Sequence, residues 1–364
     1  MGSIRTTIVI VISQSPLGPL RGREMLCSPR QSSTRKGLPH AAQSFDPPVG
    51  LRHPHVQSLL AGWPWRQRSL RRRAAGLLKA SRDEIVDCGA DVRLLGHYSA
   101  QPAAAKGLAI LLHGWEGSAA ASYVVSVGGL LYDAGYNVFR LNFRDHGETF
   151  ALNRELFHSC RIDEVVGALA TITARYAQPR TFIVGHSLGG NFALRAAARA
   201  PGAGISLTKV VAVCPVLRPS STMRALEEGL WVYRQYFLRR WRRSLLAKAA
   251  CFPDLYDFGD LRRFPTLTAT TEFFATRYAQ FPDLDSYLNG YAITGDALAQ
   301  LTVPSRLIAA ADDPVIPVDD LDDVARPPAL AIDVVAHGGH CAFLEDYGLR
   351  SWLDRAVLAE IERT

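Results

Sequence analysis

The stretch TFIVGHSLGGNFALRAAA, residues 181–198, decides the fold. Its first four residues, 181–184, are β-branched or aromatic, which indicates a short buried strand. From Phe192 to Ala198, apolar residues recur at helical spacing. Between the two lies GHSLG, residues 185–189, a G-x-S-x-G pattern. Its place between a strand and a helix indicates a nucleophile elbow.

Ser187 stands at the centre of this turn. A turn this sharp forces its central residue toward positive φ, and side chains at positions 185 and 189 would collide, which explains the two glycines. The serine oxygen is then presented at a helix N-terminus, where free N–H groups favour developing negative charge. We predict that Ser187 is a nucleophile; the alternative is a glycine-rich turn with an ordinary serine.

Composition and charge describe a globular chain. Its 364 residues are 48% hydrophobic and 21% charged, which suffices for a sizeable core in one large domain or two smaller ones. The net charge of +7 is uneven, with basic clusters at 66–82 and 239–243. Solvated surface is the commoner explanation of such clusters, and no nucleic-acid-binding motif accompanies them, so we expect no nucleic-acid partner.

The cysteines and glycines give no sign of a metal or cofactor. The six cysteines are widely spaced, without C-x-x-C pairs or the spacing of zinc ligands. Such cysteines indicate reduced thiols, and we therefore expect a cytoplasmic protein. No phosphate-binding loop or dinucleotide fingerprint occurs. The apolar run at residues 8–12 is too short to span a membrane.

The N-terminal part of the chain differs from the rest. Ser, Pro, Gly and Arg dominate residues 13–37, so we predict that residues 1 to about 44 are a disordered leader, with Met25 as a later candidate start. Residues 45–82 form an arm punctuated by prolines. We expect Trp63 and Trp65 to pin this arm to the main domain.

The main domain, residues 83–364, alternates strands and helices. A hairpin is expected around 89–91, followed by further strands at 108–112, 136–142, 181–184, 210–214, 306–310 and 331–336. Helices are expected at 118–134, 162–176 and about 349–362, besides the one after the elbow. Strands separated by helices of this length pair in parallel with right-handed crossovers.

Residues from about 216 to 302 interrupt this alternation, because they contain no good strand. We predict a helical cap there, inserted before the strand at 306–310. One of its helices has an apolar face made of Leu230, Tyr233, Phe237, Trp241 and Leu245, with arginines opposite. Packing on the core is the plain explanation, and weak association of a basic amphipathic helix with a membrane surface is the alternative.

A serine nucleophile needs a base, and the base needs an orienting group. In elbow folds the chain order is serine, acid, histidine. Only His337 and His340 lie downstream of Ser187, both in AHGGHCAF, residues 336–343. The order Gly-Gly-His, then a small residue and an aromatic one, favours His340 as the base, whereas His337 is expected at a strand end.

The acid should follow the preceding strand, in LIAAADDPVIP, residues 307–317. The pattern Asp-x-Val-Ile-Pro favours Asp313, which would hold the tautomer of His340. Asp312 is the alternative acid, and otherwise braces the turn.

An oxyanion also needs donors. The backbone N–H of Leu188 follows the nucleophile directly, and the second donor should come from a loop after an early strand. In LLHGWEG, residues 111–117, we predict the N–H of Trp115. We expect His113 to brace this loop and the carboxylate of Glu116 to be exposed.

Two further groups of polar residues are expected to be structural. The stretch RDHGE, residues 144–148, follows a strand end near the cleft mouth, and we expect a turn held by Arg144. His53 and His55 lack further ligands at suitable spacing, so we expect no metal there.

Motifs across most of the chain resemble those of a known family. They are FDP (45–47), HPHVQ (53–57), HGWEGS (113–118), LNFR (141–144), the elbow, DDP (312–314) and GGH (338–340). From about Phe45 to the C-terminus, the chain resembles the YheT-like branch of the α/β-hydrolase fold.

The resemblance implies an α/β fold with a mostly parallel central sheet flanked by helices. It also implies a serine carboxylesterase or acylglycerol-lipase-like activity that passes through an acyl-enzyme and needs no cofactor. The expected substrates are short- to medium-chain acyl esters or acylglycerol-like lipids. Two alternatives stay open: acyl transfer to an alcohol by the same three residues, and a non-catalytic lipid-binding protein of the same fold.

Overall fold

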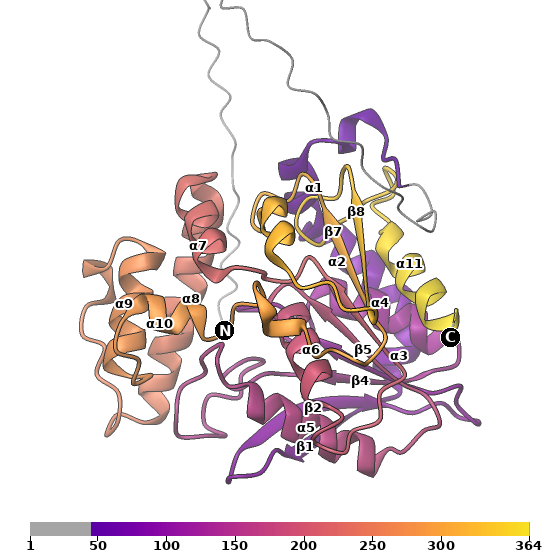
Figure 1. Ribbon diagram of the computed structural model, residues 1–364, viewed down its shortest axis with the longest axis horizontal. Helices are drawn as coiled ribbons and strands as arrows, with labels where there is room; N and C mark the ends of the chain where they lie inside the picture. Colours follow the sequence, from indigo (N-terminus) through magenta and orange to yellow (C-terminus); the bar gives the residue numbers. More distant parts are fainter. Residues whose placement is uncertain (1–44, 364) are drawn as a thin grey trace, which may run out of the picture. The chain divides into compact units, whose positions relative to one another are not determined.

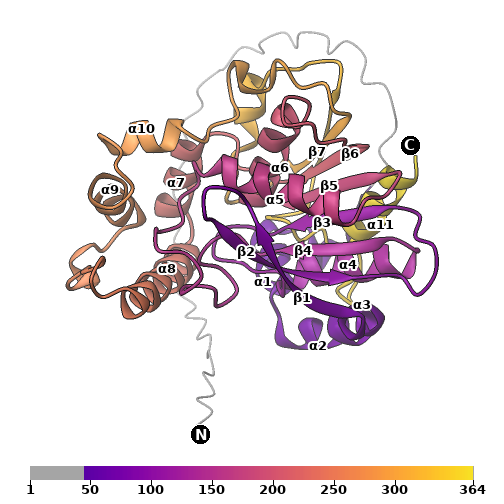
Figure 2. The same ribbon diagram turned by 90° about the horizontal axis from the view of Figure 1, so that it is seen from below.

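The computed structural model describes residues 45–363, so the predicted leader at 1–44 lies outside the described residues. A central sheet with the order β1-β2-β4-β3-β5-β6-β7-β8 runs through them (Figures 1 and 2). Its strands are β1 (Ser81–Asp87), β2 (Arg93–Ser99), β3 (Leu108–Leu112), β4 (Asn137–Leu141), β5 (Thr181–His186), β6 (Lys209–Val213), β7 (Ser305–Ala310) and β8 (Leu330–Val335). The β1–β2 and β2–β4 pairs are antiparallel and all other pairs are parallel, which confirms the mostly parallel sheet.

Helices cover both faces of the sheet. They are α1 (Pro54–Ala61), α2 (Pro64–Arg73), α3 (Ala75–Lys79), α4 (Ser122–Asp133), α5 (Ile162–Arg175), α6 (Leu188–Arg199), α7 (Pro219–Glu228), α8 (Trp231–Cys251), α9 (Leu267–Arg277), α10 (Leu284–Asn289) and α11 (Trp352–Glu362). Helices α5 and α6 share a core with one face, and α3, α4 and α11 share a core with the other.

Strand β3 shows why the sheet is buried on both sides. Leu108, Ile110 and Leu112 belong to the core on the side of α5 and α6, while Ala109 and Leu111 belong to the opposite core. All five side chains are 0% exposed. Because successive side chains of a strand point to opposite faces, a strand covered on both faces needs an unbroken apolar run.

Two expected helices begin later than the sequence suggested. The helix expected from residue 118 begins at Ser122, because the Ala119 N–H donates to the side-chain oxygen of Asn142 and Ala121 N–H closes a turn onto Ser118. The helix expected from residue 349 begins at Trp352, since Leu349 has a φ of 57° and cannot continue a right-handed helix.

Helices α7 to α10 occupy the chain between β6 and β7, and the described residues 216–302 contain no strand. The four helices stand together at one side of the sheet (Figures 1 and 2). We call them the cap helices. The domain boundaries at 45–82, 83–364 and about 216–302 stay predictions.

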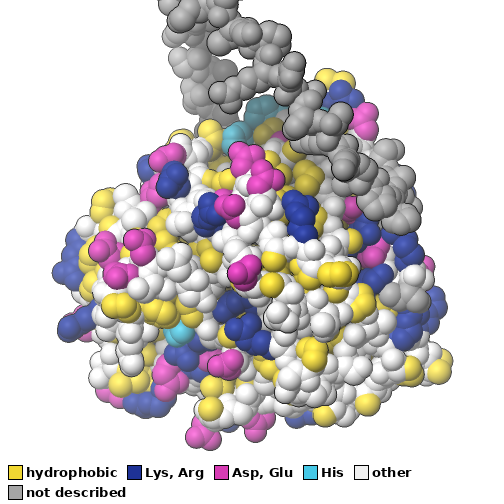
Figure 3. Space-filling model, viewed as in Figure 1, with side chains coloured by type: hydrophobic (Ala, Val, Ile, Leu, Met, Phe, Trp, Pro, Cys, Tyr) yellow, Lys and Arg dark blue, Asp and Glu magenta, His cyan; other side chains and the backbone are white. Residues whose placement is uncertain are grey.

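The surface, the helices and the cysteines of the described residues each give a further finding. On the face shown in Figure 3, acidic and basic side chains are interspersed, and no single basic patch dominates that face. None of the helices within residues 45–363 is long and apolar enough to cross a membrane. The described cysteines are all free thiols.

The tryptophans of the arm do not pin it, so that expectation is wrong. Trp63 is 45% exposed and Trp65 is 74% exposed. Helix α2 turns its buried residues, Arg66 and Leu70, inward, and this leaves the tryptophans at its N-terminal end on the outer side. The ring of Phe45 instead packs against the ring of Trp352, with the two centroids 5.2 Å apart.

Gln57 on helix α1 is the main polar anchor of the arm, and its side chain is 0% exposed. Its amide nitrogen donates to the carbonyls of Leu51 at 2.7 Å and Leu344 at 3.0 Å. Its amide oxygen accepts from the Leu344 N–H at 2.6 Å. One side chain thus joins the arm to a segment 287 residues away in the chain.

Replacing Gln57 by alanine should therefore lower the free energy of unfolding by about 2–4 kcal/mol, because three buried backbone groups lose their partner. Urea unfolding followed by circular dichroism measures this loss. Gln67→Ala is the matched control, since Gln67 is exposed and donates only to the carbonyl of Gly62. Equal unfolding midpoints for the two variants would contradict the anchor.

Candidate active site

The turn between β5 and α6 holds Ser187 in a strained conformation, with φ 54° and ψ −121°. A Cβ on Gly185 would lie 2.2 Å from the carbonyl oxygen of Gly189, and one on Gly189 would lie 2.5 Å from that of His113. The Ser187 N–H donates to Val213 O at 2.8 Å. The neighbouring strands therefore fix a backbone that the serine would not adopt alone.

Ser187, His340 and Asp313 converge at the carboxyl ends of the parallel strands. The Nε2 atom of His340 lies 3.0 Å from the Oγ atom of Ser187. The opposite nitrogen, Nδ1, lies 2.9 Å from Oδ2 of Asp313. The side chain of His340 is 16% exposed and that of Asp313 is 2% exposed. The structure thus brings together the three side chains that the sequence singled out.

The two adjacent aspartates have different partners. Oδ1 of Asp313 accepts from the N–H groups of Val315 at 2.8 Å and Ile316 at 3.0 Å, which fixes the carboxylate facing His340. Oδ1 of Asp312 accepts from the Gly339 N–H at 2.9 Å. Asp312 therefore braces the loop that carries His340, and Asp313 is the residue that contacts the imidazole.

The loop of residues 336–343, here called the histidine loop, rests on the arm. The His340 N–H donates to the Oγ atom of Ser58 at 2.9 Å. Gly339 has a φ of 53°, and a Cβ there would lie 2.6 Å from the carbonyl oxygen of Pro54. Sequence reasoning missed Ser58, although the HPHVQ motif directly before it marked the arm as unusual.

The imidazole of His340 sits in a negative environment. Burial disfavours its charged form, but Asp313 and the Cys341 sulfur outweigh burial and raise the pKa of His340 to about 9.

Among the described residues, one group of at least three His, Cys, Asp or Glu side chains has its potential metal-ligand atoms all within 4.8 Å of one another. It consists of Cys214, His340 and Cys341. Both ring nitrogens of His340 already contact Ser187 and Asp313, so this group offers a metal no free imidazole.

The loop of residues 113–117, here called the Trp115 loop, passes directly against the elbow. A Cβ on Gly114 would lie 3.2 Å from Cβ of Ser187. Leu188 is the first residue of α6, so its N–H has no acceptor within its own helix. This placement brings both predicted donor segments beside the serine. The role of the Trp115 and Leu188 N–H groups stays a prediction.

His113 braces the Trp115 loop, as expected. Its Nε2 accepts from the Phe143 N–H at 3.1 Å, so Nδ1 carries the proton and donates to the Gly114 carbonyl at 2.7 Å. Burial lowers the pKa of His113 well below its ordinary value, which keeps the ring neutral.

The expectation that Glu116 is exposed is wrong, because the side chain is only 7% exposed. Its Oε2 accepts from the hydroxyl of Ser244 on helix α8 at 2.7 Å. The Glu116 N–H donates to Nε2 of His146 at 3.2 Å. Helix α8, one of the cap helices, covers this carboxylate, and the sequence around residue 116 gives no sign of that burial.

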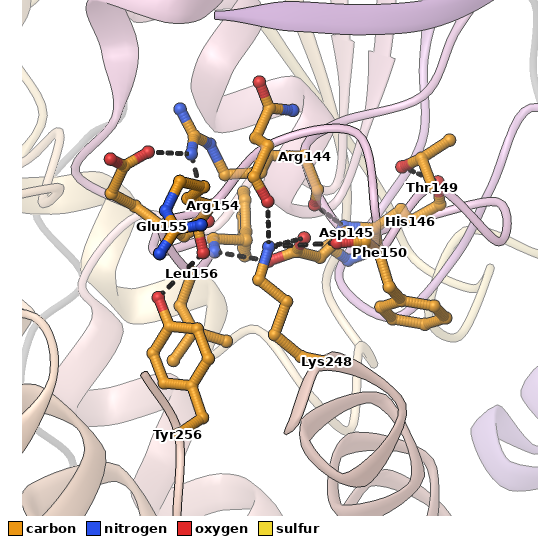
Figure 4. A network of polar contacts seen from close by, with 12 residues as sticks. Arg144, Asp145, His146, Thr149, Phe150, Arg154, Glu155, Leu156, Lys248 and Tyr256 are labelled. Carbon is orange, nitrogen blue, oxygen red and sulfur yellow. Dashed lines mark hydrogen bonds and ion pairs between the residues drawn. The ribbon is translucent and has the colours of Figure 1, made fainter. Parts of the chain in front are cut away.

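Arg144 holds the turn after β4, as expected. The guanidinium is 1% exposed and pairs with Glu164 at 2.6 Å and with Glu155 at 2.9 Å. Figure 4 shows the contact between Arg144 and Glu155 as part of a larger polar network.

The same network holds Lys248, which sequence reasoning missed. It projects from helix α8 toward the loop after β4 (Figure 4). Its Nζ lies 2.8 Å from Oδ1 of Asp145 and donates to the carbonyls of Phe150 at 3.1 Å and Asn153 at 2.6 Å. The side chain is 0% exposed. Its position three residues after Leu245, on the apolar face of the helix, is the signal that was available.

A pocket lies between the cap helices and the sheet edge. Leu188 and Trp115, the two predicted donor residues, both line it. Most of the remaining wall is aromatic or aliphatic, including Phe157, Trp241 and Phe274, and no lining residue is charged. Such a lining suits an apolar ligand group, and the pocket reaches Leu188, the residue after Ser187.

Comparisons with known proteins agree with this fold. The Pyrococcus furiosus esterase Pf2001 superposes with a TM-score of 0.52 at 15% identity, over 89% of this chain and 98% of that one. A membrane phospholipase A, described as a bacterial virulence factor, gives 0.51 at 15% identity, over 85% and 93%. At such identity these likenesses show the fold alone.

Sequence comparison identifies the family. No curated protein matches the chain. The sequence profile described as the alpha/beta hydrolase family matches residues 109–349, which include the elbow, both aspartates and the histidine loop. The chain belongs to the alpha/beta hydrolase family.

Proposed function

We propose that this protein is a serine hydrolase that cleaves carboxylic esters through an acyl-enzyme. One observation carries the proposal: His340 bridges Ser187 at 3.0 Å and Asp313 at 2.9 Å through its two ring nitrogens. A hydroxyl becomes a useful nucleophile when a base accepts its proton, and the base works best when a third group fixes its tautomer. Ser187, His340 and Asp313 take these three roles.

The geometry implies the following reaction. Oγ of Ser187 attacks the ester carbonyl while Nε2 of His340 takes its proton, and the charge of Asp313 stabilises the imidazolium. The carbonyl oxygen becomes an oxyanion that the N–H groups of Trp115 and Leu188 receive, each worth roughly 3–4 kcal/mol. The C–O bond to the alcohol then breaks, and His340 returns the proton to the leaving oxygen. Water, activated by the same imidazole, releases the acid from Ser187.

The uncharged pocket supports an acyl ester as the substrate. The acyl chain of the substrate would lie in this pocket, beside Leu188 and Trp115. Each methylene of the chain that is buried there favours binding by about 0.8 kcal/mol of transfer free energy. We propose short- to medium-chain acyl esters or acylglycerol-like lipids as substrates. The arm motifs FDP and HPHVQ support a place in the YheT-like branch of the family.

Replacing Ser187 by alanine should lower kcat for p-nitrophenyl acyl esters by about 10⁴-fold or more, because no other group forms the acyl-enzyme. Ser206→Ala is the control, since Ser206 is an exposed serine beyond the C-terminus of the same helix. A fluorophosphonate probe should label the wild-type chain at Ser187 and leave the Ser187→Ala variant unlabelled.

Three outcomes separate the proposal from its alternatives. Undiminished turnover by Ser187→Ala refutes the assignment of the nucleophile. A wild-type chain that resists the fluorophosphonate would favour a non-catalytic lipid-binding protein. A product that is mainly a new ester when a competing alcohol is present would favour acyl transfer over hydrolysis.

The dependence of kcat/KM on pH should show an acid limb well above the ordinary imidazole pKa of about 6.5. His340 acts as a base only when neutral, and its pKa of about 9 keeps the ring protonated to higher pH. Asp313→Asn removes the negative charge that favours the imidazolium, so the limb should move to lower pH.

Asp312→Asn is the control for this pH profile, because an asparagine still offers the Gly339 N–H an acceptor. Its limb should stay at the wild-type position. A wild-type limb at or below about pH 6.5 would show that Asp313 does not stabilise the charged ring.

A further inference from the structure

One face of helix α8 contacts two loops: the Trp115 loop and the loop after β4, residues 142–161. Phe237, Trp241, Ser244 and Lys248 follow at spacings of four, three and four residues, which places them along one side of a helix. The ring of Trp115 stacks on Phe237 with centroids 5.3 Å apart and meets Trp241 edge-on at 5.3 Å.

The two polar residues of this face each hold a strained loop residue. Ser244 donates to Glu116, whose φ is 55°, and Lys248 pairs with Asp145, whose φ is 59°. Residues other than glycine rarely adopt this left-handed conformation, and such strain persists where the surroundings enforce it. These two strained residues therefore both contact the same helix.

The two loops are also joined to each other. The Glu116 N–H donates to Nε2 of His146, and the proton on Nδ1 of His146 is donated to the Arg144 carbonyl at 2.7 Å. The Phe157 N–H donates to the second oxygen of Asp145 at 2.8 Å. Helix α8, the Trp115 loop and the loop after β4 thus form one connected unit.

We propose that helix α8 positions the Trp115 N–H for the oxyanion, with Ser244 and Lys248 as positioning residues. If Glu116 loses the Ser244 hydroxyl, it can relax toward negative φ. The peptide unit between Trp115 and Glu116 then turns, and ψ of Trp115 changes with it. The Trp115 N–H, which belongs to the preceding peptide unit with Gly114, thereby shifts away from the developing charge. The cap helices and the oxyanion site accordingly act as one assembly. This inference rests on the proposed ester chemistry.

The test compares Ser244→Ala with Ser244→Thr, which restores a hydroxyl, in the full chain. Arg239→Ala is the control, because Arg239 is exposed on the same helix. Ser244→Ala should lower kcat about tenfold with little change in KM, and by the same factor for two acyl chain lengths. A trifluoromethyl ketone, which forms a tetrahedral adduct with the serine, should bind the variant about tenfold more weakly.

A loss that appears in KM and depends on chain length would overturn the inference, because α8 would then only form a pocket wall. Hydrogen exchange supplies a readout that needs no turnover. The amide of Glu116 should exchange faster in Ser244→Ala and in Lys248→Met than in Arg239→Ala. Unchanged exchange refutes the positioning role, whereas a wild-type chain that cleaves no ester refutes only the proposed function.

The exposed part of the arm carries a second, independent inference. Leu59, Trp63 and Trp65 are 47%, 45% and 74% exposed, and the two indole rings meet edge-on at 6.4 Å. The arginines that follow at 71–73 are also exposed, and the sequence has no acidic residue between positions 47 and 82. We call these residues the arm surface.

We infer that the arm surface binds the headgroup region of an anionic lipid bilayer. Tryptophan favours the boundary between headgroups and acyl chains, where its ring is buried and its N–H stays hydrated. Arginines beside it would contact anionic headgroups. A nucleic acid would use the arginines, but it does not account for the exposed leucine.

Sedimentation with phosphatidylcholine vesicles, with and without phosphatidylglycerol, tests this inference on the full chain. The anionic vesicles should bind the wild-type chain, and a Trp63→Ala/Trp65→Ala variant should bind at least about tenfold more weakly. Trp231→Ala, which removes an exposed tryptophan of helix α8, is the control and should bind like the wild type. Equal binding by the arm variant, or binding of an oligonucleotide in preference to the vesicles, refutes the inference.

Discussion

The site depends on one backbone constraint, the positive φ of Ser187. A serine in a helix or strand would lie against the sheet, but this conformation lifts its oxygen above the strand ends. The constraint holds because Gly185 and Gly189 let three backbone segments meet where a single methyl group would not fit. The neighbouring strand then fixes the turn through the Val213 carbonyl. Every other feature of the site is arranged around an oxygen whose position is already set.

The parts that sequence reasoning predicted are those governed by local rules. The elbow, the buried strands and the order of serine, acid and histidine each follow from a short pattern with a physical cause. The choice of Asp313 over Asp312 agrees with the contacts, because the residues after Asp313 supply N–H groups that turn its carboxylate toward His340. Helix starts were less accurate, since Asn142 and the positive φ of Leu349 act on them from outside the helical pattern.

The parts that it missed depend on contacts between distant segments. Glu116 is buried because helix α8 covers it, and Ser244 on that helix is 128 positions further along the chain. Lys248 follows the arginine cluster at 239–243, for which solvated surface is the commoner explanation, yet its charge is wholly buried against Asp145. Its place on the apolar face of α8 was a signal of this burial. For Trp63 and Trp65, residue type favoured burial, but the way α2 packs placed them outside. In each case the residue type is compatible with both burial and exposure, and contacts between distant segments decide which one occurs.

The contact between Ser58 and His340 joins positions separated by 282 residues. Bringing together two segments so far apart in the chain costs loop-closure entropy before their contacts stabilise the fold, so such contacts form late in folding. A chain still emerging from the ribosome would therefore carry a finished elbow without an aligned imidazole. On the proposed function, Ser187 gains its base only when the two distant segments have met.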